Sequence, residues 1–178
     1  MDIEKLKYPI GKFEVPSNIT PEILAAWASI IEHFPNRLSS LVSSLEDSQL
    51  NTPYRPEGWT VRQVVHHLHD SHHNAYTRFK WALTEETPHI KAYDEKAWAN
   101  LFDSKVAPID ISLNSLAALH AKWAYLLKGL SFANFEREFI HPDGNQPMSL
   151  SYTTGMYAWH SNHHYAHIKN LLKRESWK

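Results

Sequence analysis

Histidine is concentrated in two short segments of this chain. Of its 13 histidines, five lie in "HHLHDSHH" (residues 66–73) and four lie in "HSNHHYAH" (residues 160–167). Neutral imidazole is a good ligand for divalent zinc, nickel, iron and copper. The chain has no cysteine, so disulfides and thiolate ligands are excluded. The two segments therefore suggest a metal site that is built from nitrogen and oxygen ligands.

The second segment contains two histidine pairs with i, i+4 spacing, His160/His164 and His163/His167. This spacing places both imidazoles of a pair on one face of a helix, one turn apart. The apolar side chains of the same helix form an arc, made by Tyr157, Ile168 and Leu171. On a helical wheel His160 and His164 fall within that arc, whereas His163 and His167 lie toward its edge. The pattern predicts that His160 and His164 face the interior.

The first segment is less decisive. Its apolar stripe at helical spacing consists of Val61, Val64, Val65, Leu68, Ala75, Phe79, Ala82 and Leu83. The wheel places His72 inward and His67 at the border of the stripe, a position that suits a ligand at the mouth of a bundle. His66, His69 and His73 are predicted to point outward. Periodicity alone leaves the third ligand open between His67 and His72.

These segments must be positioned by helices, and two helix starts are clear. Thr20 is a good N-cap and Pro21 fits the first helical position, so a helix is expected from there to about residue 45. Pro35 lies inside that helix and is expected to kink or split it. Thr60 and Gln63 form a capping box that begins the helix with the first histidine segment.

Two further long helices are predicted, over 112–128 with Gly129 just past the end, and over 149–173. A long connection precedes the third helix, with a short helix after Asp94. The stretch "FIHPDGNQPM" is typical of a turn with extended flanks, or a small hairpin. Four long helices with almost no strand pattern predict an all-α fold, a four-helix bundle formed by one domain over residues 1–178.

Composition excludes several classes of function. The net charge of −1 gives no reason to expect a nucleic-acid or membrane-surface partner. No apolar run approaches the ~20 residues that a membrane span needs. The N-terminal stretch "MDIEKLKYPIGKFEV" lacks the basic-then-apolar layout of a signal peptide. We therefore expect a cytoplasmic protein that acts on a small molecule.

Several longer stretches resemble one family of metalloenzymes. They are "PYRPEGWTVRQVVHHLHDSHHNAY", "LTEETP", "YDEKAW" and "YAWHSNHHYAHI", and the similarity begins at "YPIGKF" near the N-terminus. They look like the YfiT-type metal-dependent hydrolases of the DinB-like superfamily, which also has bacillithiol-transferase-like members. The resemblance implies a four-helix bundle, a homodimer, and one divalent metal per chain, Zn²⁺ or Ni²⁺. The implied ligands are His67, His160 and His164, so the choice of His67 rests on the resemblance.

Three neutral imidazoles leave a coordination position open, which is typical of a catalytic site and not of a closed structural one. Water in that position loses a proton near neutral pH, so we expect hydrolysis of a small substrate. The same ion could activate a low-molecular-weight thiol, so a metal-dependent thiol S-transferase is one alternative. A non-catalytic metal-binding bundle is another. Asp70, three residues after His67, is expected either to accept the N–H of that ligand or to form an exposed salt bridge.

The other histidines are expected to have ordinary roles. A solvated or core hydrogen-bonded state is predicted for His66, His69, His73 and His163. The same holds for the histidines without a partner motif, which are His33, His89, His120 and His141. His72 and His167 are expected to form hydrogen bonds beside the site without binding the metal. Tyr157 and Trp159, next to the predicted ligands, are expected to line a pocket.

Overall fold

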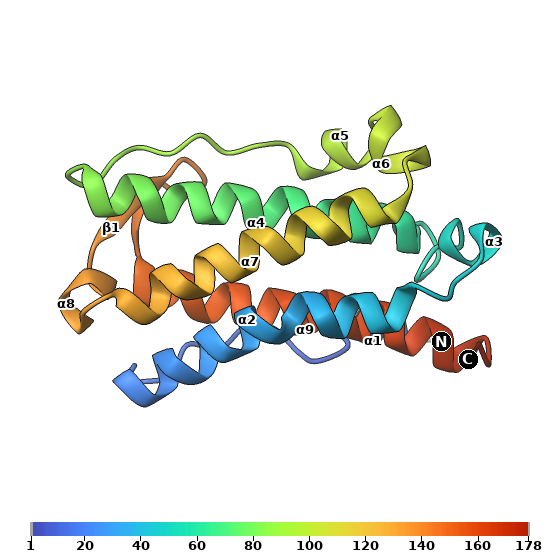
Figure 1. Ribbon diagram of the computed structural model, residues 1–178, viewed down its shortest axis with the longest axis horizontal. Helices are drawn as coiled ribbons and strands as arrows, with labels where there is room; N and C mark the ends of the chain where they lie inside the picture. The colour runs from blue at the N-terminus through green and yellow to red at the C-terminus, as the bar shows by residue number, and fades with distance from the viewer. Residues whose placement is uncertain (1, 178) are drawn as a thin grey trace.

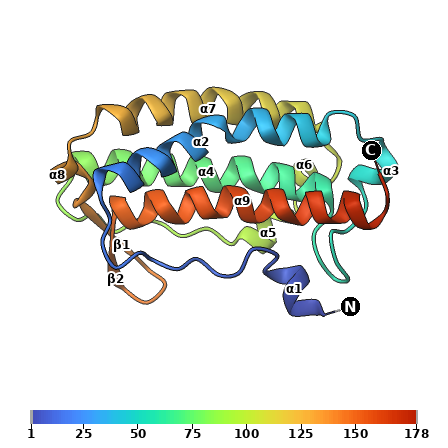
Figure 2. The same cartoon turned by 90° about the horizontal axis from the view of Figure 1, so that it is seen from below.

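Four long helices pack side by side in the computed structural model, which describes residues 2–177 (Figure 1). They are α2 (Pro21–Val42), α4 (Val61–Thr84), α7 (Ile109–Gly129) and α9 (Leu150–Arg174). Helices α2 and α4 each contact both α7 and α9. Figure 2 shows α9 alongside α4, with α2 and α7 on the other side of the bundle. The predicted four-helix bundle is therefore confirmed.

The helices begin where their capping residues predict. Thr20 Oγ1 accepts a hydrogen bond from the backbone N–H of Ile23 at the start of α2. At the start of α4, Thr60 Oγ1 accepts from the N–H of Gln63, and the Gln63 side chain accepts from the N–H of Thr60. Ser149 caps α9, so this helix lies within a residue of its predicted range. Each cap satisfies a backbone donor that the first helical turn leaves unpaired.

Pro35 does not divide α2, which runs unbroken from Pro21 to Val42. Because proline has no N–H, the carbonyl of Ile31, four residues earlier, lacks its usual helical partner. His120 of α7 takes that place, with its Nδ1 2.5 Å from the Ile31 oxygen. Of the two alternatives expected for Pro35, a kink or a split, the split is wrong. The carbonyl that Pro35 leaves unpaired accepts a hydrogen bond from a neighbouring helix.

Shorter elements join the long helices. The helices are α1 (Ile3–Lys7), α3 (Asp47–Leu50), α5 (Glu95–Ala99), α6 (Phe102–Val106) and α8 (Phe132–Phe135). Asp94 caps α5, as predicted. Strands β1 (Glu138–His141) and β2 (Gln146–Ser149) form the predicted hairpin, with Phe139 opposite Met148. Helix α7 begins three residues before its predicted start and includes Gly129, which was expected to lie just beyond its end.

The connection over residues 85–108 crosses the outer face of α4 (Figure 1). It is fixed to the hairpin by a bridge between His89 and Ile140, where the Ile140 N–H donates to the carbonyl of Pro88. At its other end it carries α5 and α6, both of which contact α4. Helix α4 is therefore covered on its outer face as well as within the bundle.

The core consists of two apolar clusters. One includes Phe34, Leu38, Leu68, Leu116 and Ile168. The other includes Ile31, Phe79, Trp123, Phe139 and Leu150. The rings of His72 and His120 lie between them, because both contact Phe34 of the first cluster and Trp123 of the second. Both histidines are fully buried, so a polar layer crosses the middle of the bundle.

None of the helices within residues 2–177 is both long enough and apolar enough to cross a membrane.

Candidate metal centre

Three histidine side chains meet where α4 and α9 lie side by side. They are His67 of α4 and His160 and His164 of α9, and one ring nitrogen from each lies within 4.8 Å of the others. The Nε2 atoms of His67 and His160 are 3.3 Å apart. The His164 ring lies 4.6 Å from that of His160 and 4.9 Å from that of His67, between centroids. The structure thus brings together the three residues predicted as ligands; their binding of a metal stays a prediction.

Helix geometry accounts for this meeting. His160 and His164 are four residues apart, so α9 presents them one above the other. His67 reaches them from α4, and its ring packs against Trp59, just before the start of that helix, at 4.7 Å. His72 also points inward, as the wheel predicts, but it lies deeper and faces α7. His67, at the border of the apolar stripe, therefore lines an open cavity, whereas His72 is enclosed by the core.

Burial keeps these imidazoles neutral. It lowers the pKa of His67 to about 4, partly opposed by the negative charge of Asp70. Burial is also the main cause that holds the pKa of His160 and of His164 well below the usual value, and neighbouring imidazoles add to it. Neutral imidazole is the form that binds a metal ion. The cluster is therefore in its metal-binding protonation state at neutral pH.

The spacing of the donor atoms fits a divalent ion. Two nitrogens about 2.0–2.1 Å from a tetrahedral ion stand roughly 3.3–3.4 Å apart, and the Nε2 atoms of His67 and His160 are separated by 3.3 Å. No carboxylate belongs to this group of donors. Imidazole donors without carboxylate or thiolate suit zinc or nickel better than magnesium or calcium, which prefer oxygen.

The three rings form one wall of an open cavity of about 380 Å³. Aromatic side chains supply most of the remaining surface, and Glu95 supplies its one carboxylate. The full lining is Trp59, His67, Ser71, Tyr93, Glu95, Met156, Tyr157, Trp159, His160 and His164. Tyr157 and Trp159 were expected here. Trp59, Tyr93 and Glu95 were not identified as lining residues, because the connection that carries two of them has no helical period to follow.

A polar cavity of about 510 Å³ adjoins the first and shares Trp59 and Glu95 with it. It is bordered by the start of α4 and by α5, and its charged side chains include Arg55 and Lys96 as well as Glu57. The two cavities together offer an aromatic surface beside the histidines and a polar surface next to it.

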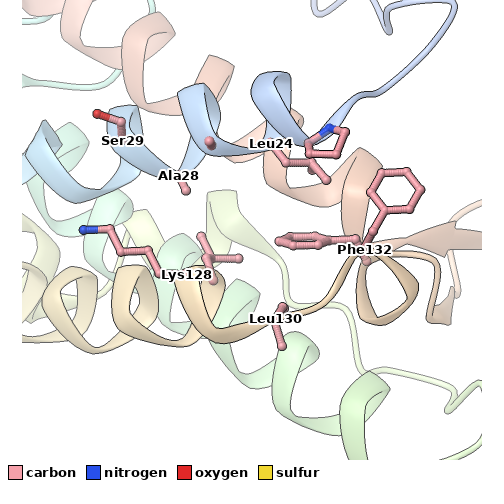
Figure 3. Close-up of a pocket in the computed structure, with 10 residues that line it drawn as sticks. Leu24, Ala28, Ser29, Lys128, Leu130 and Phe132 are labelled. Atoms are coloured by element: carbon pink, nitrogen blue, oxygen red, sulfur yellow. The ribbon is translucent and has the colours of Figure 1, made fainter.

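A third cavity, of about 330 Å³, lies between α2 and the segment that follows α7 (Figure 3). Leu24, Leu130 and Phe132 give it an apolar surface, and Ser29 and Lys128 lie at one end. The Lys128 ammonium is paired with Glu32 at 2.6 Å. Its lining contains neither histidine nor carboxylate, so the histidine cavity is the candidate site for metal chemistry.

The structure bears on two expectations for α4. Asp70 was expected either to accept from His67 or to form an exposed salt bridge; its carboxylate lies 3.3 Å from Nδ1 of the adjacent His69, with both side chains about a quarter exposed, which fits the second alternative. His66 was predicted to point outward, yet it is 6% exposed and contacts the Ser112 hydroxyl at 2.7 Å. The wheel assumed one buried face, whereas the connection over residues 85–108 covers the other. His73 is exposed, as predicted.

Histidines beside the cluster form a hydrogen-bonded set. His72 joins His160 to His120, with nitrogen separations of 3.1 Å and 2.7 Å. Nδ1 of His167 lies 3.4 Å from Nδ1 of His164, and Nε2 of His167 lies 3.0 Å from the carbonyl oxygen of Lys7. The expected hydrogen bonds of His72 and His167 beside the site are present. His120 was given no role, since its partners come from α2 and α4 and its own helix has no motif that reveals them.

Comparison with known proteins agrees with the family resemblance of the sequence. Residues 30–168 match the family model of the DinB superfamily. YfiT of Bacillus subtilis is 50% identical over 172 residues, 97% of each chain, and a protein of Oceanobacillus iheyensis is 51% identical over 171 residues, 96% of this chain and 98% of its own. The solved structure of YfiT superposes with a TM-score of 0.95 at 49% identity, covering 98% of this chain and 99% of that one. That structure is described as a probable metal-dependent hydrolase with an unusual four-helix bundle topology.

Proposed function

This chain belongs to the DinB superfamily, and from that membership we propose that it is a metal-dependent hydrolase whose divalent ion is held by His67, His160 and His164. The observation that carries the proposal is the convergence of three neutral imidazoles, two buried and that of His160 half-buried, in the wall of an open cavity. Buried histidines normally pair with a protein group, whereas here Nε2 of His67 and Nε2 of His160 face each other. Both lone pairs would be satisfied by one divalent ion held between them.

The three imidazoles would hold a zinc or nickel ion, which would supply Lewis-acid chemistry toward water, a carbonyl or a thiol. The protein keeps the three ligands neutral by burial and orients them by the packing of α4 against α9. Its cavity admits a small molecule to the same point. Glu95, the carboxylate of the lining, is the candidate to accept a proton or to bind a cationic group of the substrate.

The lining favours a small substrate with an apolar or aromatic group next to the bond that is cleaved. Trp59, Tyr157 and Trp159 supply flat apolar surface around the cluster. Burial raises the pKa of Tyr93, so this phenol stays protonated and can donate to a substrate oxygen. Esters and amides of aromatic or apolar acids are therefore the first substrates to test.

Thiol transfer is a second candidate, and the adjoining polar cavity favours it. A transferase must bind two molecules, a thiol and an electrophile, next to one ion. The aromatic cavity suits an apolar electrophile, whereas Arg55 and Lys96 of the polar cavity suit a low-molecular-weight thiol with anionic groups. Trp59 and Glu95, shared by both cavities, lie at the junction where the two molecules would meet.

The test is an activity screen with defined metal content. Apo-protein is loaded with Zn²⁺ or Ni²⁺ and assayed with ester and amide panels, and separately with an anionic thiol and a chlorinated aromatic electrophile. We expect activity that disappears on chelation, returns on adding the ion, and is lost in His67→Ala. His73→Ala, which removes an exposed histidine of the same helix, is the matched control and retains activity. Ester or amide turnover supports hydrolysis, consumption of thiol supports transfer, and activity that persists without metal contradicts both.

A further inference from the structure

Two of the three clustered histidines have their other ring nitrogen turned toward a second histidine. Nδ1 of His160 lies 3.1 Å from Nε2 of His72, and Nδ1 of His164 lies 3.4 Å from Nδ1 of His167. Metal-binding histidines usually donate this second N–H to a carboxylate, a main-chain carbonyl or water. Here the acceptor is another imidazole. Its facing nitrogen has a lone pair only when the proton of that ring lies on its other nitrogen.

A main-chain carbonyl fixes the direction of the first chain of hydrogen bonds, which runs from Ile31 through His120 and His72 to His160. The Ile31 oxygen can only accept, so Nδ1 of His120, 2.5 Å away, carries a proton and Nε2 of His120 is the acceptor. The proton between His120 and His72 must then lie on Nδ1 of His72, which is 2.7 Å from that acceptor. Nε2 of His72 is consequently a lone pair that accepts from Nδ1–H of His160. Nε2 of His160 is left without a proton.

The second chain is shorter and leads to the same state. The Lys7 oxygen, in the last turn of α1, accepts from Nε2–H of His167 at 3.0 Å. Nδ1 of His167 is therefore a lone pair, and it accepts from Nδ1–H of His164. Nε2 of His164 is left free of a proton, like that of His160. The two carbonyls belong to different elements, one to α1 and the other to α2.

We propose that His72 with His120, and separately His167, are positioning residues that fix His160 and His164 in the Nδ1–H tautomer and hold their Nε2 lone pairs toward a shared divalent ion. The proposal rests on the proposed metal site. Pro35 contributes to this arrangement, because a proline at this position leaves the Ile31 carbonyl available at the end of the first chain of hydrogen bonds. The chains prepare the site before the ion arrives, which avoids the cost of selecting tautomers on binding.

Two features make the first chain effective. His72 and His120 are fully buried, so water does not compete for their hydrogen bonds. Their ring planes lie within 18° of each other with centroids 4.9 Å apart, and both rings pack against Phe34 and Trp123, which restricts rotation. Burial also lowers the pKa of His120 to about 4, so the ring is neutral at physiological pH. A neutral ring has one donor and one acceptor, as the chain requires.

The direct test measures tautomers in the metal-free protein. Long-range ¹H–¹⁵N correlation spectra of the ¹⁵N-labelled, chelator-treated full chain distinguish a protonated from an unprotonated ring nitrogen. We expect Nδ1–H in His72, His120, His160 and His164, and Nε2–H in His167. An Nε2–H tautomer at His72 or His160 would overturn the first chain, and an Nε2–H tautomer at His164 would overturn the second.

A set of variants tests whether the chain matters for binding. His120→Phe keeps an aromatic ring but removes the acceptor of His72, so the Ni²⁺ affinity measured by calorimetry should fall by roughly 10- to 100-fold. His120→Gln retains a carbonyl oxygen for His72 and an N–H for Ile31, and it should restore most of the affinity. His66→Phe is the matched control, since His66 is a buried histidine of α4 with hydrogen bonds to Ser112 and Ala107, outside either chain. Its affinity should equal that of the unaltered protein.

The outcomes separate this proposal from the proposed function. Unchanged Ni²⁺ affinity and unchanged His160 tautomer in His120→Phe would overturn the positioning role even if the enzyme is active. Equal losses in His120→Phe and His66→Phe would also overturn it, since they would indicate a general effect on the fold. The expected tautomers in a protein that binds neither Zn²⁺ nor Ni²⁺ would support the two chains and contradict the metal site.

Discussion

The protonation of single ring nitrogens determines what the histidine cluster can bind. An imidazole that carries a proton on Nε2 cannot be a ligand through that atom. The hydrogen bonds from Ile31 through His120 and His72 exclude that state for His160. On the proposed arrangement the cluster is thus more than three histidines at a suitable spacing, because the residues behind them would decide which lone pairs are open to an ion.

All three clustered histidines should be required for tight metal binding. We expect isothermal titration with Ni²⁺ to give about one tight site per chain, in line with a three-nitrogen site, and we expect His67→Ala, His160→Ala and His164→Ala each to abolish it. His69→Ala and His73→Ala remove histidines that lie outside the cluster and should keep the site. A His67→Ala variant that retains full-strength binding would show that the third ligand is another residue, with His72 the next candidate.

Single residues also show where sequence reasoning succeeds. The i, i+4 spacing and the apolar arc of α9 predicted that His160 and His164 share an inward face, because both follow from helical period. His67 required the family resemblance, since its wheel position lies at a border. His66 was misplaced and His120 was overlooked for one reason: their surroundings are set by segments distant in the sequence, the connection to α7 and the proline of α2.

At the level of elements, the site depends on close packing of α9 against its neighbours. Gly155 lies in α9 opposite α2, and a Cβ there would stand 2.7 Å from Trp27 and 2.9 Å from Phe13. Both distances are far below ordinary van der Waals contact. The glycine therefore lets α9 approach α2 and the N-terminal segment while its next turn presents His160 to α4.

Gly155→Ala should destabilise the protein although alanine is the better helix former. The gain in propensity is about 1 kcal/mol, whereas overpacking against two aromatic rings costs about 1–3 kcal/mol. Urea unfolding of the apo-protein should therefore show a net loss of stability. Gly129→Ala is the matched control, because a Cβ at that helical position meets nothing within 4 Å, and it should be neutral or stabilising. A more stable Gly155→Ala variant would contradict the packing argument.

The long elements could be predicted from sequence more fully than the short ones. Thr60 with Gln63 and Ser149 mark helix starts by local chemistry, and the structure has helices there. Helices α1, α3, α6 and α8 have only four or five residues and were not predicted. Segments this short are unstable in isolation and form because the rest of the molecule holds them, so local pattern carries little information about them.

The whole molecule holds its fold with two apolar clusters on either side of the histidine layer. Both clusters combine side chains from different long helices, so the bundle has cohesion independent of any ion. The metal is expected to add stability only through binding linkage, about 2.7 kcal/mol when free metal is 100 times its dissociation constant. We therefore expect the bundle to form without the metal.

Chelation tests this expectation. We expect metal-free protein to keep its far-ultraviolet circular dichroism and its cooperative melting, with a lower melting temperature that recovers when Zn²⁺ or Ni²⁺ is added. The helical caps and buried clusters are the physical reason. Loss of most helical signal in the apo form would instead assign the ion a structural role.

Buried histidines should make the stability of the apo-protein depend on pH. The pKa of His120 is lowered to about 4 by burial, whereas an unfolded chain gives about 6.5. As pH falls below 6.5 the unfolded state takes up a proton that the folded state refuses, so stability decreases down to about pH 4 and is unaffected above 6.5. Each such group contributes up to about 1.4 kcal/mol per pH unit. Urea unfolding between pH 7.5 and 4.5 should show this decrease, with a shallower slope in His120→Gln; equal slopes would contradict the contribution of His120.

The central claim, that a divalent ion binds between α4 and α9, is tested most directly by diffraction. Crystals of the Ni²⁺-loaded protein, measured on both sides of the nickel absorption edge, locate the ion by its anomalous signal. We predict one strong peak per chain, bonded to Nε2 of His67, His160 and His164, with a coordination position facing the aromatic cavity that no protein atom occupies. A peak elsewhere in the chain, or a fourth protein ligand that closes the site, would contradict the account.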